Sequence, residues 1–193
     1  QERPQAATQP IPTEYPEDVT FYLVMGLQAA RRSSKIGGAW RLYVLAKALD
    51  GHGREAVGSV LADDLRAFAL HLGVNPKTYR RWYKRAVNAG LFDPIQDKRG
   101  AWRLALPSAG KAAHYIGADD IGRKVEISAA DLIGPGWKAR VNAGLSARGL
   151  QISRERQQKT YNIPASTQQY RDNQAGVNRT ANYACSDYKA DEL

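Results

Sequence analysis

The segment 77–103 concentrates cationic side chains that could contact nucleic acid. It holds eight lysines and arginines against Asp93 and Asp97, and so carries six of the nine net positive charges of the 193-residue chain. Arginine reads guanine edges with its forked donors, and both cations neutralise phosphates. At about 100° per residue, the polar and apolar residues of 76–90 fall on opposite sides of a helix. The predicted contacts of this helix with DNA are Lys77, Thr78, Arg80, Arg81, Lys84, Arg85 and Asn88.

Residues that could support catalysis or hold a metal are few and badly spaced. The three histidines form no metal-binding pattern. The acidic pairs Asp63-Asp64 and Asp119-Asp120 are adjacent in sequence, whereas two-metal chemistry needs converging carboxylates. The single cysteine, Cys185, lies in a polar stretch beside no obvious base. We therefore expect no enzyme, no cofactor and no metal site.

Composition favours a protein with an anionic partner. The net charge is +9 and the isoelectric point is near 9.7. No apolar run approaches the 18 residues or so that cross a bilayer, so we expect a soluble chain without a membrane partner. The proline-rich, acidic residues 1–17 predict a flexible leader, and residues 177–193 predict a polar tail.

Apolar spacing predicts helices that position the cationic segment. We expect one from Glu17-Asp18 to about Arg32, although the apolar run 21–25 also fits a strand. Gly37-Gly38 predicts a break, and helices over 39–49 and 62–72 follow. The turn 73–76 leads into the cationic helix, which we expect to end at Gly90.

Two short apolar runs flank the sequence Asp97-Lys98-Arg99-Gly100 and predict a β-hairpin directly after the cationic helix. We expect Trp102 to pack at the base of this hairpin. We also expect the helix residues Trp82 and Tyr83 to belong to the core.

The stretch 65–82 resembles the helix-turn-helix family. Ala69 is a small residue where two helices cross, and Gly73 stands where the turn needs a left-handed backbone. With the hairpin, residues 39–116 look like a winged helix, and the hairpin is similar to that of MarR-type regulators. The resemblance does not extend to the dimerisation helices of that family, so ligand sensing is not implied. It does imply that Lys98, Arg99 and Arg103 contact the DNA backbone or the minor groove.

A second unit is predicted over residues 123–176. Residues 127–132 fit a strand end or a capped helix start, and a helix is expected over 137–147. Residues 153–171 look like a weaker helix-turn-helix. Its second helix offers residue types that can read base edges: Ser166, Thr167, Gln168, Gln169 and Arg171. The alternative is a helical appendage for packing or dimerisation.

These observations predict a mainly α fold with a small β-hairpin. A winged-helix domain over 18–122 would precede the second unit. The expected activity is sequence-reading binding of double-stranded DNA, in transcription control or in replication and maintenance of a mobile element. We expect no small-molecule ligand, and the C-terminal unit would extend the footprint or pair two chains as a homodimer. The expected location is the cytoplasm, at the nucleoid, or a viral or mobile-element nucleoprotein complex. The alternative is an adaptor module whose basic face binds RNA or an acidic protein.

Overall fold

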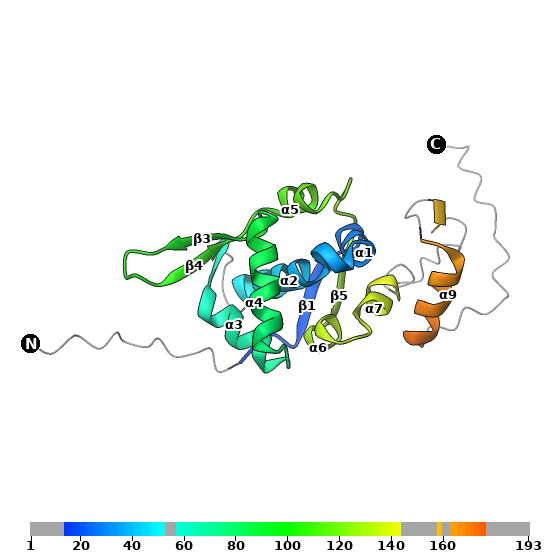
Figure 1. Ribbon diagram of the computed structural model, residues 1–193, viewed down its shortest axis with the longest axis horizontal. Coiled ribbons are helices and arrows are strands. Elements are labelled where there is room, and N and C mark those ends of the chain that lie inside the picture. The colour runs from blue at the N-terminus through cyan, green and yellow to red at the C-terminus, as the bar shows by residue number, and fades with distance from the viewer. Residues whose placement is uncertain (1–13, 53–56, 144–157, 160–162, 177–193) are drawn as a thin grey trace, which may run out of the picture.

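The computed structural model describes residues 14–52, 57–143, 158–159 and 163–176. These residues form a mainly α fold, as predicted, and two small antiparallel sheets where a single β-hairpin was predicted (Figure 1). Across the described ranges, no helix combines the length and the apolar character that a membrane span requires.

The chain enters the fold as a strand. Strand β1 (Asp18–Tyr22) pairs antiparallel with β5 (Lys124–Ser128), and helix α1 (Leu23–Arg31) begins only after it. The predicted helix start at Glu17-Asp18 is therefore wrong. Val19 and Phe21 point inward in alternation, which suits a strand. The strand is completed by β5, a partner too distant in sequence to be seen in local periodicity.

The predicted break at Gly37-Gly38 is also wrong. A π-helical turn, η1 (Ser33–Gly37), leads directly into α2 (Gly38–Gly51). The glycines serve close packing instead. A Cβ atom at Gly38 would lie 2.2 Å from Cδ1 of Trp82, so any larger residue there would displace the indole.

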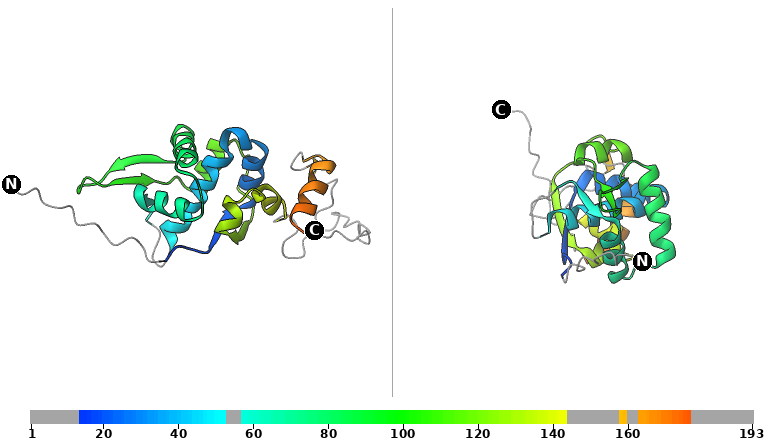
Figure 2. Two further views of the ribbon diagram at one scale, coloured as in Figure 1. Left: turned by 60° about the horizontal axis from the view of Figure 1, so that its bottom comes forward. Right: turned by 90° about the vertical axis from the view of Figure 1, so that its left-hand side faces the viewer.

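The cationic segment 77–103 forms one helix and two strands, which pack with a further helix and strand. The elements are β2 (Ser59–Leu61), α3 (Ala62–His71), α4 (Pro76–Asn88), β3 (Asp93–Gln96) and β4 (Trp102–Ala105). Strand β4 lies between β2 and β3. The predicted helices and hairpin are present, whereas β2 was not predicted. The hairpin of β3 and β4 projects away from the helices (Figures 1 and 2).

Residues 124–143 join the same core. Helix α5 (Ala109–Ile116) precedes β5, and α6 (Ala129–Ile133) and α7 (Trp137–Ala143) follow it. Trp137 packs on Trp40 of α2, with ring centroids 5.8 Å apart. The predicted boundary at 122/123 thus falls between segments that share one sheet and one core. Ser128 ends the strand and also caps α6, so both interpretations of that segment hold.

The end of the predicted leader is packed onto the body. Tyr15 stacks on Phe68 of α3 with ring centroids 4.8 Å apart. The carbonyl of Glu17 accepts a 2.7 Å hydrogen bond from the N–H of Ala129. The prediction of a flexible leader over 1–17 is therefore wrong for these residues. Its first thirteen residues lie outside the described ranges, as does the predicted tail 177–193.

Candidate nucleic-acid interface

The turn before α4 has the predicted backbone. Gly73 is left-handed at φ +84°, and the N–H of Val74 donates to the carbonyl of Ala69 over 3.0 Å. The side chain of Asn75 caps the helix by accepting from the N–H of Lys77 at 2.9 Å. Gly90, at φ +74°, ends the helix as predicted. Local sequence therefore fixes both ends of α4.

The inward face of α4 is anchored by an aromatic and cationic stack. Trp82 is buried against Gly38, and the guanidinium of Arg41 lies 4.1 Å from its ring centroid. The same guanidinium lies 4.9 Å from the ring of Trp137 and donates to the carbonyl of Ile133 at 3.0 Å. Burial lowers the pKa of Arg41 to about 10, so it stays charged at neutral pH. This stack fixes α4 on α2 and α7.

The remaining inward residues of α4 agree with the predicted core. Tyr79 and Ala86 are buried, and Tyr83 is half-buried against Tyr79 and Phe92. Burial raises the pKa of the Tyr79 phenol well above its usual value. The apolar side of α4 is thus an integral part of the core.

The outward side of α4 carries exposed cations. Lys77, Arg80, Arg81 and Lys84, named here the cationic face, are exposed together with Asn88, and Thr78 is half-buried. This separation of polar and apolar sides follows the predicted periodicity. Contact of these side chains with DNA stays a prediction.

Arg85 differs from the other predicted contacts of α4. It is half-buried, and its Nη1 donates to the carbonyl of Ser34 in η1 over 2.6 Å. Its guanidinium therefore ties α4 to the π-helical turn, and this part of its hydrogen-bonding capacity is already used.

Of the three hairpin residues predicted to contact DNA, two are exposed to solvent. Lys98 and Arg99 are exposed in the turn, where the Asp97 carboxylate accepts from the N–H groups of Arg99 and Ala101 at 2.8 and 3.0 Å. Arg103 instead donates to the Ser59 hydroxyl at 3.0 Å and is half-buried. Its guanidinium joins β4 to the unpredicted strand β2, so part of its hydrogen-bonding capacity is already used, and its contact with DNA stays a prediction.

Trp102 does not pack at the base of the hairpin as predicted. Its side chain is 56% exposed. Strand β2 pairs with β4 only as far as Arg103, and Trp102 lies opposite Gln96 of β3 alone. The residue stands where the three-stranded sheet becomes a two-stranded hairpin, beyond the reach of the core.

Two further exposed cations lie on elements that contact α4 and were not predicted. Lys35 is exposed next to Ser34, which Arg85 contacts. Arg66 is exposed on α3, and its charge acts on the ionisation of Tyr79. A helix-turn-helix brings its two helices together, so the spacing of 65–82 already implied that α3 lies beside α4. That spacing could have identified Arg66.

The predicted second DNA-reading helix is only partly available. Helix α9 (Ala165–Gln174) packs on α7. Gln168 is buried and donates to the carbonyl of Ile163 at 2.6 Å, which removes it from the set that could read bases. Arg171 is half-buried, and burial lowers its pKa.

The other members of that set lie nearer the surface. Ser166 and Gln169 are exposed, and Thr167 is half-buried. The helix that should precede α9 falls on 153–162, of which only residues 158–159 are described. The buried polar side of α9 favours the alternative of a packing appendage.

One buried carboxylate in the described part of the chain, that of Asp50, has a structural role. No group of three or more histidine, cysteine, aspartate or glutamate side chains is close enough there to hold a metal. Cys185 lies outside that part. The fully buried carboxylate of Asp50 accepts from the N–H groups of Val57 and Gly58, both at 3.0 Å, and from the ammonium of Lys47 at 3.3 Å. It therefore ties the end of α2 to the approach to β2.

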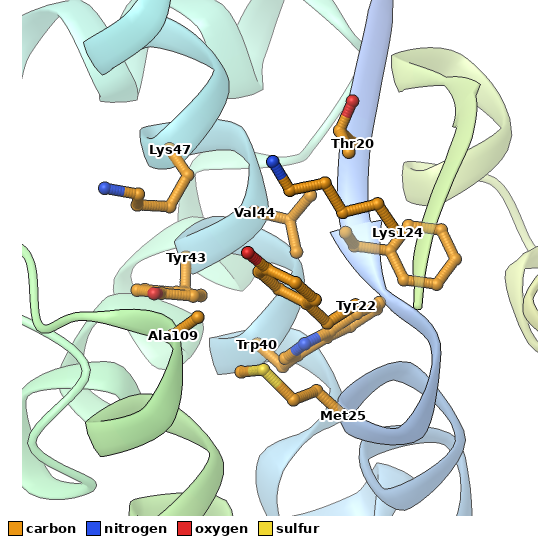
Figure 3. Close-up of a pocket in the computed structure, with 10 residues that line it drawn as sticks. Thr20, Tyr22, Met25, Trp40, Tyr43, Val44, Lys47, Ala109 and Lys124 are labelled. Atoms are coloured by element: carbon orange, nitrogen blue, oxygen red, sulfur yellow. The ribbon is translucent and has the colours of Figure 1, made fainter. Parts of the chain in front are cut away.

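A cavity of about 230 Å³ lies between β1, α2, α5 and β5 (Figure 3). Tyr22, Tyr43 and Lys124 surround it, over an apolar floor that includes Trp40. The α2 residues that line the cavity, among them Trp40 and Tyr43, lie roughly 140° around that helix from Gly38 and Arg41, which contact Trp82 of α4. The volume is below the ~300–1,000 Å³ of typical ligand pockets. The cavity is separate from the cationic face.

Comparison of the chain with family models, with curated proteins and with solved structures finds no match. The candidate interface therefore rests on the geometry described above.

Proposed function

We propose that this protein binds double-stranded DNA and reads its sequence through helix α4, in a winged-helix arrangement. The biological setting that we propose is transcription control, or replication and maintenance of a mobile element of phage or plasmid type. Binding itself is the activity, and catalysis plays no part in the proposal.

The order of the elements supports the winged-helix part of the proposal. Helix α2, strand β2, helices α3 and α4 and strands β3 and β4 follow one another, with β4 in the middle of the sheet. A glycine-centred turn joins α3 to α4. A helix of this kind enters the major groove, and a hairpin directly after it reaches the neighbouring backbone or minor groove.

The single observation that carries the proposal is the cationic face of α4. One side of this helix is anchored by Trp82 and the other side is exposed, with arginines and lysines on consecutive turns. With Lys98 and Arg99 of the hairpin, six exposed cations could meet phosphates or bases. Six phosphate contacts give a slope of log K against log salt of about −5.

A salt-titrated binding assay tests the proposal. The variant Arg80→Ala/Arg81→Ala/Lys84→Ala is compared with wild type on a random 30-base-pair duplex, with wild type also tested on single-stranded RNA. The control variant Lys111→Ala/Lys124→Ala/Arg140→Ala removes the same amount of charge from exposed positions on other elements. Both variants lower the formal net charge from +9 to +6, because each loses three cations.

We expect the α4 variant to lose duplex affinity and to reduce the salt slope by about 2–3, since each phosphate contact contributes about 0.9. The control should keep the wild-type slope. Equal losses in the two variants would show that only total charge matters, and the assignment of α4 would be wrong. Tighter binding of wild type to RNA than to duplex DNA would favour the adaptor alternative.

A further inference from the structure

The hairpin carries an exposed tryptophan that the proposed contacts of α4 do not use. Trp102 is 56% exposed, whereas Trp40, Trp82 and Trp137 are each 8% exposed or less. Ile95 on the paired strand is 43% exposed. A projecting hairpin with a bare indole has a surface suited to contact with another flat apolar group.

The sheet register fixes the direction of this indole. Side chains alternate along a strand, so Trp102 shares its face of β4 with Leu104, which is fully buried. Trp102 therefore projects on the side of the sheet that covers the core, one pair beyond the end of β2. Ile95 lies opposite Arg103 and so on the other face.

The hairpin holds Trp102 in a fixed position. At the base, Arg103 donates to the backbone carbonyl of Ser59 at 3.3 Å as well as to its hydroxyl. At the turn, the N–H of Asp97 donates to the carbonyl of Ala101 at 2.9 Å, and Gln96 donates to the carbonyl of Gly100 at 3.0 Å. Hydrogen bonds therefore hold the backbone of the hairpin on both sides of Trp102.

Charge around the indole indicates the chemistry of its partner. Lys98 and Arg99 are exposed in the turn, while the Asp97 carboxylate is directed to backbone N–H groups within it. A partner with both flat apolar faces and a polyanionic backbone satisfies the indole and the cations together. DNA bases and phosphates have this combination, and aromatic side chains stack on bases with little regard to sequence.

We propose that Trp102 stacks on a base at the edge of the DNA site and inserts where base stacking is interrupted. Apolar wedges of this kind enter between base steps from the minor groove and kink the duplex. The inference rests on the proposed function, since it concerns the DNA that α4 holds. It adds a preference for locally unstacked DNA, and it gives the hairpin a role beyond phosphate contact.

The test compares a 30-base-pair duplex with the same duplex containing a two-base mismatch bubble. Wild type should bind the bubble more tightly by about 5- to 150-fold, which is the stacking contribution of one base. Trp102→Leu should lose this preference and keep duplex binding with its salt slope. Trp102→Tyr should keep part of the preference, because a ring remains. Ile95→Ala, on the opposite face, should behave as wild type.

Fluorescence gives a second readout, which reports on the indole of Trp102 itself in variants that bind DNA. Binding of the bubble should quench tryptophan emission in wild type and leave it unchanged in Trp102→Tyr, because the other three tryptophans are buried. Bubble preference that persists in Trp102→Leu, or equal quenching in wild type and Trp102→Tyr, would overturn the inference. So would salt-dependent binding of wild type that makes no distinction between bubble and duplex. If wild type binds neither DNA, the proposed function itself fails.

Discussion

Replacement of Gly38 by alanine tests how α4 is held. The new Cβ would lie 2.2, 2.3 and 2.6 Å from Cδ1, Nε1 and Cε2 of Trp82, whereas carbon atoms pack at about 3.5–4.0 Å. The indole would have to retreat by more than 1 Å. It is confined, because it is buried and stacked against Arg41. Overpacking of this kind costs about 1–3 kcal/mol.

The net effect is smaller than that cost, because alanine favours a helix over glycine by about 1 kcal/mol. With contacts this close we take the upper part of the overpacking range, and so expect Gly38→Ala to lower the free energy of unfolding by about 1–2 kcal/mol. Urea denaturation measures it as a lower midpoint at an unchanged slope. The control is Gly51→Ala at the other end of α2, where nothing lies within 4 Å of the added Cβ. We expect that variant to be as stable as wild type or slightly more so.

A double-mutant cycle assigns the cost to the indole. In the background Trp82→Leu, which is itself destabilised, the penalty of Gly38→Ala should disappear, and the alanine should become neutral or stabilising. Gly38→Ala with wild-type stability would refute the reasoning. An unchanged penalty in the Trp82→Leu background would also refute it, since the clash would then lie elsewhere.

Three further changes test contacts that position the interface. Asp50→Ala leaves two backbone N–H groups before β2 without their acceptor, and should cost roughly 2–4 kcal/mol in urea denaturation; an unchanged midpoint would contradict this. Burial raises the pKa of Tyr43 to about 12, so the folded state retains its proton more strongly than the unfolded state between pH 10 and 12. The stability advantage of wild type over Tyr43→Phe, measured by denaturation at both pH values, should shrink by about 2 kcal/mol over that interval, and a constant difference would refute the cause given. Arg103→Gln should lower the thermal midpoint and leave the salt slope of DNA binding unchanged, because the guanidinium of Arg103 donates to Ser59 of β2; a smaller slope would show that Arg103 contacts a phosphate.

Local signals predicted the helical part of the interface well. Gly73 marked the turn, Asn75 and Gly90 marked the ends of α4, and periodicity separated its exposed and buried sides. Each of these features depends on residues within a few positions of one another. The chemistry of the exposed side could therefore be assigned before any fold was known.

Features that depend on distant partners escaped prediction. A helix was preferred for β1, with a strand over 21–25 left open, because the apolar run is short and the partner β5 is far along the chain. Strand β2 has three residues, too few for a periodic signal, and without it the bond of Arg103 to Ser59 could not be foreseen. For the same reason Trp102 was expected to pack at the base of the hairpin. Its exposure follows from where β2 ends.

The pairing of β1 with β5 also determines the order in which elements can form during synthesis of the chain. Tyr22 lies opposite Lys124, so the first strand waits for about a hundred further residues before its partner exists. At ~5–20 residues per second on the ribosome, that delay is about 5–20 s. During it, the apolar residues Val19 and Phe21 have no sheet to join, while α3, α4 and the hairpin can already assemble from neighbouring segments. Helix α4 would thus be in place first, and β1 would be among the last elements to pair.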